Sequence, residues 1–173
     1  MAYDVIEIQP TLFTGAQQDT DLLADWTEIK LPARSVRVLN IQGALNDADG
    51  NDDTYALFFA QQNTNSLGTL GVKGTNLTFS QLLENKILGK ADLEFNDAAF
   101  PAIRAGSAST ALRFGTLHQP VGDTDNEFVG MTPPLILKSG LTDNVVYLAI
   151  YSEGTGGGTF AADAMRLFLH VEY

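Results

Sequence analysis

Cysteine is absent from the 173 residues of this chain. Without thiols the protein cannot form a disulfide framework, a zinc–thiolate site or a cysteine nucleophile. It has only two histidines, His118 and His170, too few for a three-histidine zinc site, and neither lies in a His-Glu-x-x-His pattern. We expect both histidines to be surface or half-buried residues with no catalytic or metal-binding role.

Basic side chains are also scarce, with 10 Lys and Arg against 21 Asp and Glu and a formal net charge of -11. Such a chain gains nothing from counterion release on nucleic acid and is repelled by anionic lipid. No apolar run approaches the ~20 residues of a transmembrane helix. The N-terminal "MAYDVIEIQP" lacks the basic and apolar segments of a signal peptide. We expect a soluble protein, made in a cytoplasm, that binds neither nucleic acid nor membrane.

Most of the sequence alternates between apolar and polar residues with a period of two, which is typical of β-strands. In residues 164–173 one side of the strand is apolar throughout, as expected of a buried face, while the other side carries mostly polar side chains. The apolar side consists of Met165, Leu167, Leu169, Val171 and Tyr173. Residues 54–62 and 144–152 are apolar at both parities, which indicates strands covered on both faces. Residues 35–45 change phase, which predicts a β-bulge near residues 38–39. Shorter strands are expected at 4–8, 26–31, 110–117 and 134–138.

The stretch "LTFSQLLENKILGK" breaks this alternation. Its apolar residues recur at i, i+3, i+4 and i+8 from Phe79, which is helical spacing. Thr78 and Gln81 have the spacing of a capping box, and Gly89 is placed to end a helix in a left-handed cap. The pattern predicts one short helix near 79–88.

Many short strands separated by Gly, Asn, Asp and Pro predict an all-β, mainly antiparallel β-sandwich. The eight expected strands favour a jelly roll. With no internal repeat and no linker-like segment, we expect residues 1–173 to form a single domain. Residues 1–15 have two interpretations: an ordinary first strand, or an extended N-terminal arm that reaches a neighbouring molecule.

The acidic stretch "NDADGNDDT" at 46–54 is the most conspicuous candidate for a cation site. Its carboxylates belong to Asp47, Asp49, Asp52 and Asp53. An EF-hand register through Gly50 would place Leu45 and Ala56 at two essential ligand positions, so that interpretation fails. Asp-Gly between apolar alternating runs favours a hairpin turn, and a cation site of another kind stays as the alternative.

A second acidic segment at 122–128, together with Asp19, Asp21 and Asp25, is interpreted as solvated negative charge.

The glycines of "SEGTGGGTF" at 152–160 lack the third glycine and the helix of a dinucleotide site, so we expect a connection between antiparallel strands. The small residues at 105–110 contain no nucleophile elbow. We therefore name no catalytic, cofactor-binding or metal-binding residue.

The order of these segments resembles small structural proteins of tailed bacteriophages, which sit on the virion as head-decoration or capsid-associated proteins. The resemblance is carried by "DVIEIQPTLFT", "DTDLLADWTEIKLPAR", "VLNIQGALNDADGND", "YALFFAQQNTNSLGT", "ILGKADLEF" and "NVVYLAIYS". It implies a non-enzymatic decoration or cement protein on the outer surface of the head, made in the bacterial cytoplasm. The implied partners are the major capsid protein and further copies of the chain, with a trimer as the first expectation. Apolar patches, a strand edge or a terminal arm would make the contacts.

A carbohydrate-binding or receptor-binding sandwich of a virion appendage, with acidic loops that hold calcium, is the alternative. Such modules present aromatic platforms to sugars, and the only tryptophan, Trp26, lies in a segment that also has the pattern of a strand. A glycosidase or depolymerase is a third hypothesis, without a recognisable pair of carboxylates.

Overall fold

The computed structural model describes residues 1–18, 21–47, 53–63, 70, 72–75, 84–95, 103–104, 111–117, 135–140, 143–153 and 159–173. Within these residues the chain forms ten strands and no helix. The strands are β1 (Tyr3–Ile8), β2 (Leu22–Lys30), β3 (Ser35–Asp47), β4 (Asp53–Ala60), β5 (Ile87–Phe95), β6 (Ile103–Arg104), β7 (Ala111–Leu117), β8 (Ile136–Lys138), β9 (Val145–Ser152) and β10 (Met165–Glu172).

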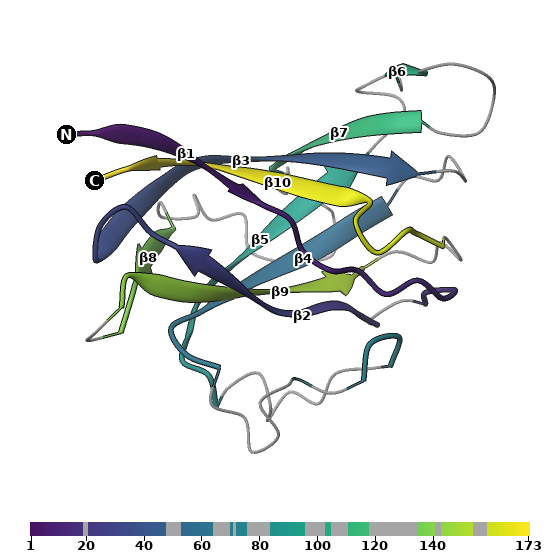
Figure 1. Cartoon of the computed structure of the whole chain (residues 1–173), viewed down its shortest axis with the longest axis horizontal. Helices are drawn as coiled ribbons and strands as arrows, with labels where there is room; N and C mark the ends of the chain where they lie inside the picture. The colour runs from purple at the N-terminus through teal and green to yellow at the C-terminus, as the bar shows by residue number, and fades with distance from the viewer. Residues whose placement is uncertain are drawn as a thin grey trace, which may run out of the picture.

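The eight longer strands pair in a nested order. β1 pairs with β10, β2 with β9, β3 with β7 and β4 with β5, all antiparallel. This nesting places β1-β10-β3-β7 in one layer and β2-β9-β4-β5 in the other (Figure 1). The layers join at one corner, where β5 and β7 share a short ladder, and β6 and β8 lie beside β7 and β3. In a jelly roll the first strand pairs with the last, the second with the last but one, and so on inward, and the paired strands form two four-stranded sheets. The pairs observed here follow this arrangement, so the predicted fold class is confirmed.

The main core lies between the two layers and is built from alternate side chains. On β10, the inward side chains of Met165, Leu167, Leu169 and Val171 are fully buried, while the residues between them are exposed or half-buried. This is the one-sided pattern predicted for residues 164–173. The second layer contributes Tyr55, Leu57, Phe59, Val146, Leu148 and Ile150 to the same core.

A β-bulge interrupts β3 where the sequence changes phase. The register with β10 runs from His170 opposite Asn40 to Val171 opposite Val38, so Leu39 has no partner. Val38 before the bulge and Ile41 after it can therefore both face the core. The bulge predicted near residues 38–39 is confirmed, and its extra side chain, Leu39, is 48% exposed.

The helix predicted near 79–88 is wrong where the structure describes it. Residues 84–86 form a turn, and β5 begins at Ile87 and continues through Gly89, which pairs with Phe59. The left-handed residue is Lys86, with φ of 53°, and not Gly89. A Cβ atom at Gly89 would overlap the Leu135 side chain, so this glycine serves close packing within a strand. Residues 79–83 lie outside the described residues.

The first strand takes the ordinary form. β1 pairs along β10 within the same chain, and Ala2 and Tyr173 exchange backbone hydrogen bonds of 2.8 and 3.0 Å. The two termini therefore lie side by side at one end of the sandwich (Figure 1). β1 also leaves one of its edges without a neighbouring strand among the described residues.

Candidate functional site

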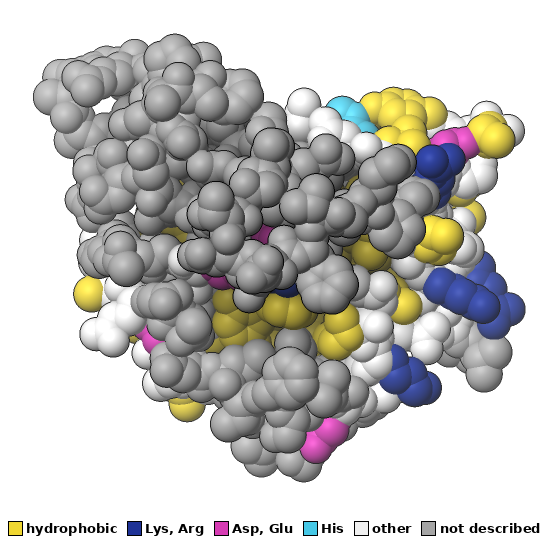
Figure 2. Space-filling view, turned by 180° about the vertical axis from the view of Figure 1, so that it is seen from behind, with side chains coloured by type: hydrophobic (Ala, Val, Ile, Leu, Met, Phe, Trp, Pro, Cys, Tyr) yellow, Lys and Arg dark blue, Asp and Glu magenta, His cyan; other side chains and the backbone are white. Residues whose placement is uncertain are grey.

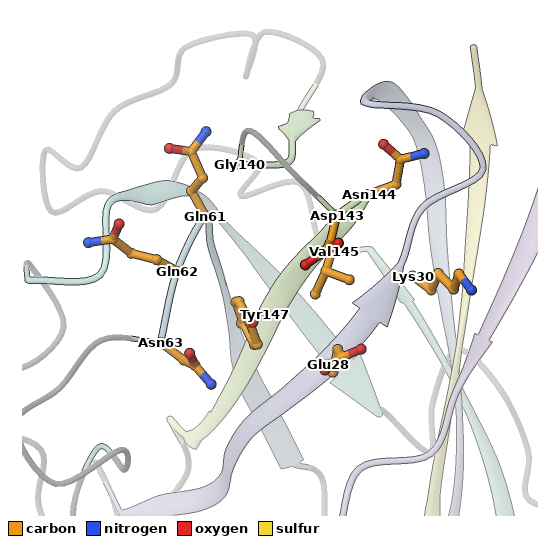
Figure 3. A pocket seen from close by; sticks show the side chains of 10 residues that line it. All are labelled: Glu28, Lys30, Gln61, Gln62, Asn63, Gly140, Asp143, Asn144, Val145 and Tyr147. Carbon is orange, nitrogen blue, oxygen red and sulfur yellow. The ribbon is translucent and has the colours of Figure 1, made fainter.

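A polar cleft of about 630 Å³ opens on the outer face of the second layer. It lies where β2 ends, β9 begins and the chain leaves β4 (Figure 3). Its lining residues are Glu28, Lys30, Gln61, Gln62, Asn63, Gly140, Asp143, Asn144, Val145 and Tyr147. Residues from three segments that are far apart in the sequence, 28–30, 61–63 and 140–147, therefore line one depression.

Val145 and Tyr147 of β9 form the floor of this cleft. Because Val146 between them points into the main core, its two neighbours must face outward. The strand register places Tyr147 between Glu28 on β2 and Ala60 on β4. The half-buried tyrosine ring thus has a carboxylate on one side and a small side chain on the other.

Two glutamines on one wall are held by backbone carbonyl groups. Gln61 Nε2 donates to the carbonyl oxygens of Lys138 and Ser139 at 3.1 and 3.3 Å. Gln62 Nε2 donates to the carbonyl oxygen of Glu84 at 3.1 Å. Since the amide nitrogens are used in this way, the side-chain oxygens of both glutamines are left to accept hydrogen bonds from a ligand.

The charged residues of the cleft are two acids and one base. Glu28 and Lys30 project from the end of β2, and Asp143 lies just before β9. Carboxylate and amide oxygens therefore outnumber the ammonium group as hydrogen-bonding partners. The arrangement is suited to holding a ligand rich in hydroxyl or N–H donors.

The acidic stretch 46–54 joins the end of β3 to the beginning of β4. β3 ends at Asp47 and β4 begins at Asp53, and these strands lie in different layers without pairing to each other. The hairpin interpretation of this stretch is therefore wrong, because the chain crosses from one sheet to the other here. Residues 48–52 lie outside the described residues. Among the residues that the structure does describe, no three His, Asp or Glu side chains gather as metal ligands would.

Two aspartates expected to carry solvated charge instead bind backbone. Asp21 is only 5% exposed, and its carboxylate accepts a hydrogen bond from the Gln18 N–H at 2.8 Å. Asp25 Oδ1 accepts from the N–H groups of Trp26 and Leu70 at 2.8 and 2.9 Å. The expectation was wrong for these two residues, while Asp19 and residues 122–128 lie outside the described residues.

His170 and Trp26 both contact neighbouring side chains of the sandwich. His170 lies on the outward parity of β10, as predicted, where Nδ1 is hydrogen-bonded to the Tyr3 hydroxyl and Nε2 lies 3.3 Å from Gln42 Oε1. Trp26 is half-buried against an apolar cluster on the second layer, so it is not an exposed platform. The aromatic residue that faces a cleft is Tyr147, which the sequence analysis did not single out. His118, residues 105–110 and residues 154–158 lie outside the described residues.

A second feature of the surface is an apolar patch beside the two termini. Its exposed side chains, which we call the terminal patch, are Met1, Tyr3, Val5, Leu39, Ile136 and Tyr173. The patch extends over four strands but is interrupted by charge. The register aligns Tyr3, Glu172, Arg37 and Ile136 across β1, β10, β3 and β8, so a charged pair lies between the apolar Tyr3 and Ile136. Figure 2 shows hydrophobic side chains next to a histidine at this end of the molecule. Val72 is the one other exposed large hydrophobic residue in the described part of the chain.

Comparison with known proteins adds no relative. No protein-family model matches the chain, and neither a curated protein nor a solved structure matches it. In the portion of the chain that the structure describes, no helix is long and apolar enough to cross a bilayer.

Proposed function

We propose that this protein is a non-enzymatic structural protein of a bacteriophage virion, which binds the outer surface of the head as a decoration or cement protein. The terminal patch is the observation that carries this proposal, and the order of sequence segments supports it. A jelly roll is also found in viral capsid proteins, although it is found in lectins and cupins as well, so the fold alone decides nothing.

The terminal patch has the composition of an attachment surface. Exposed apolar side chains that gather among a few polar ones are typical of surfaces that bind another macromolecule. Charges within and beside the patch are paired: Arg37 lies 4.0 Å from Glu172, and Arg166 lies 2.6 Å from Glu7. A chain of net charge -11 thus presents a locally balanced face, which lowers the electrostatic cost of contact with a capsid.

We infer that the face of the sheet, and not its edge, makes this contact. The open edge of β1 is blocked at its centre, because Asp4 Oδ1 accepts a hydrogen bond of 2.8 Å from the Val5 N–H. Acidic side chains on an edge strand oppose the addition of a further strand. Side chains that project from the outer face, such as Val5 and Leu39, have no such obstacle.

The proposal is tested on purified particles of the phage that encodes the chain. We expect stoichiometric copies on the outside of the head in a cryo-EM reconstruction, arranged as homo-oligomers, with trimers as the first expectation. The variant Val5→Lys/Leu39→Lys should fold and be lost from particles. Val72→Lys, the matched control outside the patch, should be retained. Absence of the wild-type protein from purified particles would defeat the proposal.

A further inference from the structure

We propose that the cleft between β2, β9 and residues 61–63 binds a neutral oligosaccharide. The site goes beyond attachment to a capsid, and it requires no part of the proposed virion role. Its volume of about 630 Å³ lies within the ~300–1,000 Å³ of typical small-ligand sites. The terminal patch lies on the other layer, so both surfaces can act in the same molecule.

The floor of the cleft matches the apolar face of a sugar ring. A pyranose has C–H groups on its faces and hydroxyl groups around its rim. Tyr147 offers an aromatic face whose hydroxyl-bearing end can also hydrogen-bond, and Val145 extends this apolar strip along β9. The small side chain of Ala60, opposite Tyr147 on β4, places no large group beside the ring.

The walls of the cleft match the hydroxyl rim. Gln61, Gln62, Glu28 and Asp143 present oxygens that accept hydrogen bonds, and sugar hydroxyls are donors. The two glutamines are already held by backbone carbonyl groups, at 3.1 and 3.3 Å for Gln61 and at 3.1 Å for Gln62. Binding therefore costs less side-chain entropy at these positions than at free glutamines.

Charge selects a neutral ligand over an anionic one. The two carboxylates of the cleft repel sulfated or sialylated glycans, and the overall charge of -11 acts in the same direction. Lys30 offsets one of the two carboxylates, which weakens the attraction of the cleft for a cationic ligand such as a basic peptide. A polyhydroxylated neutral molecule uses the acceptors without meeting the repulsion that an anionic glycan meets.

The first experiment exposes the intact protein to an array of neutral oligosaccharides that end in glucose, galactose, mannose or N-acetylglucosamine, with sulfated and sialylated ones as the anionic comparison. We expect binding only to neutral glycans, confirmed by calorimetry and retained in 0.5 M NaCl. No binding to any neutral glycan would overturn the proposal. So would binding of lysine-rich peptides that is lost in salt, or release of shortened glycan products, which would indicate hydrolysis.

Variants then locate the site. Tyr147→Ala should weaken binding roughly tenfold, and Tyr147→Phe should retain most of it, because the ring face makes the main contact. Asp143→Asn should weaken binding roughly threefold by replacing a charge-assisted hydrogen bond with a neutral one. Asp143 is exposed, so its replacement leaves the fold intact even if Tyr147→Ala does not fold.

Tyr3→Ala is the matched control, since Tyr3 is an exposed tyrosine on the other layer. It should leave glycan affinity unchanged. Unchanged binding in Asp143→Asn and in folded Tyr147→Ala would place the glycan elsewhere and refute the assignment. Glycan binding and presence on particles are separate measurements, so either proposal can fail without the other.

Discussion

The outer faces of the two layers show how one strand pattern gives two kinds of surface. On the first layer, outward side chains pair with each other in solvent, as Arg166 does with Glu7 and Tyr3 with His170. On the second layer, much of the outer face is a further apolar cluster. Its members are Leu22, Ala56, Leu70, Ala149 and Tyr151, with Trp26, Phe58 and Ile87 packed against them. The second layer is therefore covered on both sides over part of its area.

The covering comes from the connection between β4 and β5. Leu22 N donates to the Thr75 carbonyl oxygen at 3.1 Å, and Gly74 N donates to the Leu22 carbonyl oxygen at 2.9 Å. Nearby, the Leu70 N–H binds the Asp25 carboxylate. These bonds attach the connection to the beginning of β2, so a surface segment becomes part of the packing. The first residues of the same connection, residues 61–63, line the cleft instead.

The largest expected effect comes from removing the side chain that caps the covered face. Leu70 is 1% exposed, and Leu70→Ala should lower the free energy of unfolding by about 2–4 kcal/mol, because it removes buried methyl groups and leaves a cavity. Urea unfolding measures the change. Val72→Ala is the control two residues along the same connection, where the side chain is 72% exposed and the change should be near zero. If both variants lowered the free energy of unfolding equally, burial of Leu70 against β2 would not contribute to the stability of the fold.

Asp25 lies on the covered part of the second layer and Asp4 on the open edge of β1, so replacing each of them compares a covered position with a solvent-exposed one. Asp25 and Asp4 each accept the N–H of the next residue at 2.8 Å, but only Asp25 also binds the Leu70 N–H. Asp25→Ala should cost about 1–3 kcal/mol, because it leaves part-buried donors unpaired. Asp4→Ala should cost less than about 0.5 kcal/mol, because water replaces the carboxylate. Thermal and urea unfolding of both variants decide the matter, and a larger loss in Asp4→Ala would contradict it.

The apolar pattern of the sequence predicted most of the strands and also that β4 and β9 are covered on both faces, which is confirmed by the two apolar clusters that these strands join. The bulge at Leu39 and the doubly apolar run in β9 follow from local periodicity, and both are observed. β5 was missed because its register with β4 depends on partners distant in sequence, while a helical stripe ran into its first residues. The cleft was missed for a related reason. Along β9 the outer side chains change from covered Ala149 and Tyr151 to open Tyr147, and nothing local marks that change.

A smaller change in the free energy of unfolding, an increase instead of a loss, is expected when Tyr151 is replaced by phenylalanine. Its hydroxyl is buried and has no hydrogen-bond partner within the described residues, and the ring packs edge-on against Phe58 with 5.4 Å between centroids. Tyr151→Phe keeps the ring and removes the unpaired group. It should raise the free energy of unfolding by about 1 kcal/mol at neutral pH. A loss of stability would show that the hydroxyl is hydrogen-bonded.

The same variant should alter the response to alkaline pH. Burial, and then the Asp25 carboxylate, raises the pKa of the Tyr151 hydroxyl above its ordinary value of 10.0. Above that pH the unfolded chain loses this proton while the folded chain keeps it, so stability falls by about 1.4 kcal/mol per pH unit. Tyr151→Phe removes this part of the decline. Urea midpoints at pH 9, 10 and 11 should therefore diverge between wild type and variant, and parallel curves would contradict the assignment.

The smallest effect concerns ion pairs, for which the two faces again differ. On the second layer, Lys90 Nζ lies 3.0 Å from Asp92, contacts Glu153 and sits 6.0 Å from the centre of the Phe58 ring. Burial acts to lower the pKa of Lys90, but hydrogen bonds and charge from Glu153 and Asp92 outweigh it, so the pKa lies above its ordinary value. On the first layer, Arg166 and Glu7 form a single pair with both side chains more than half exposed.

Double-mutant cycles compare these two pairs directly. For Glu7→Gln with Arg166→Gln we expect a coupling of about 0.3 kcal/mol, because exposed side chains lose entropy on pairing and water screens the charges. For Glu153→Gln with Lys90→Gln we expect about 1 kcal/mol, because the ammonium is partly withdrawn from solvent, though its exposed part still lowers the value. Raising NaCl to 1 M should abolish the first coupling and reduce the second by less, since partly buried charges are screened less. Equal couplings, or equal salt sensitivity, would mean that covering the second layer does not change the electrostatics at its margin.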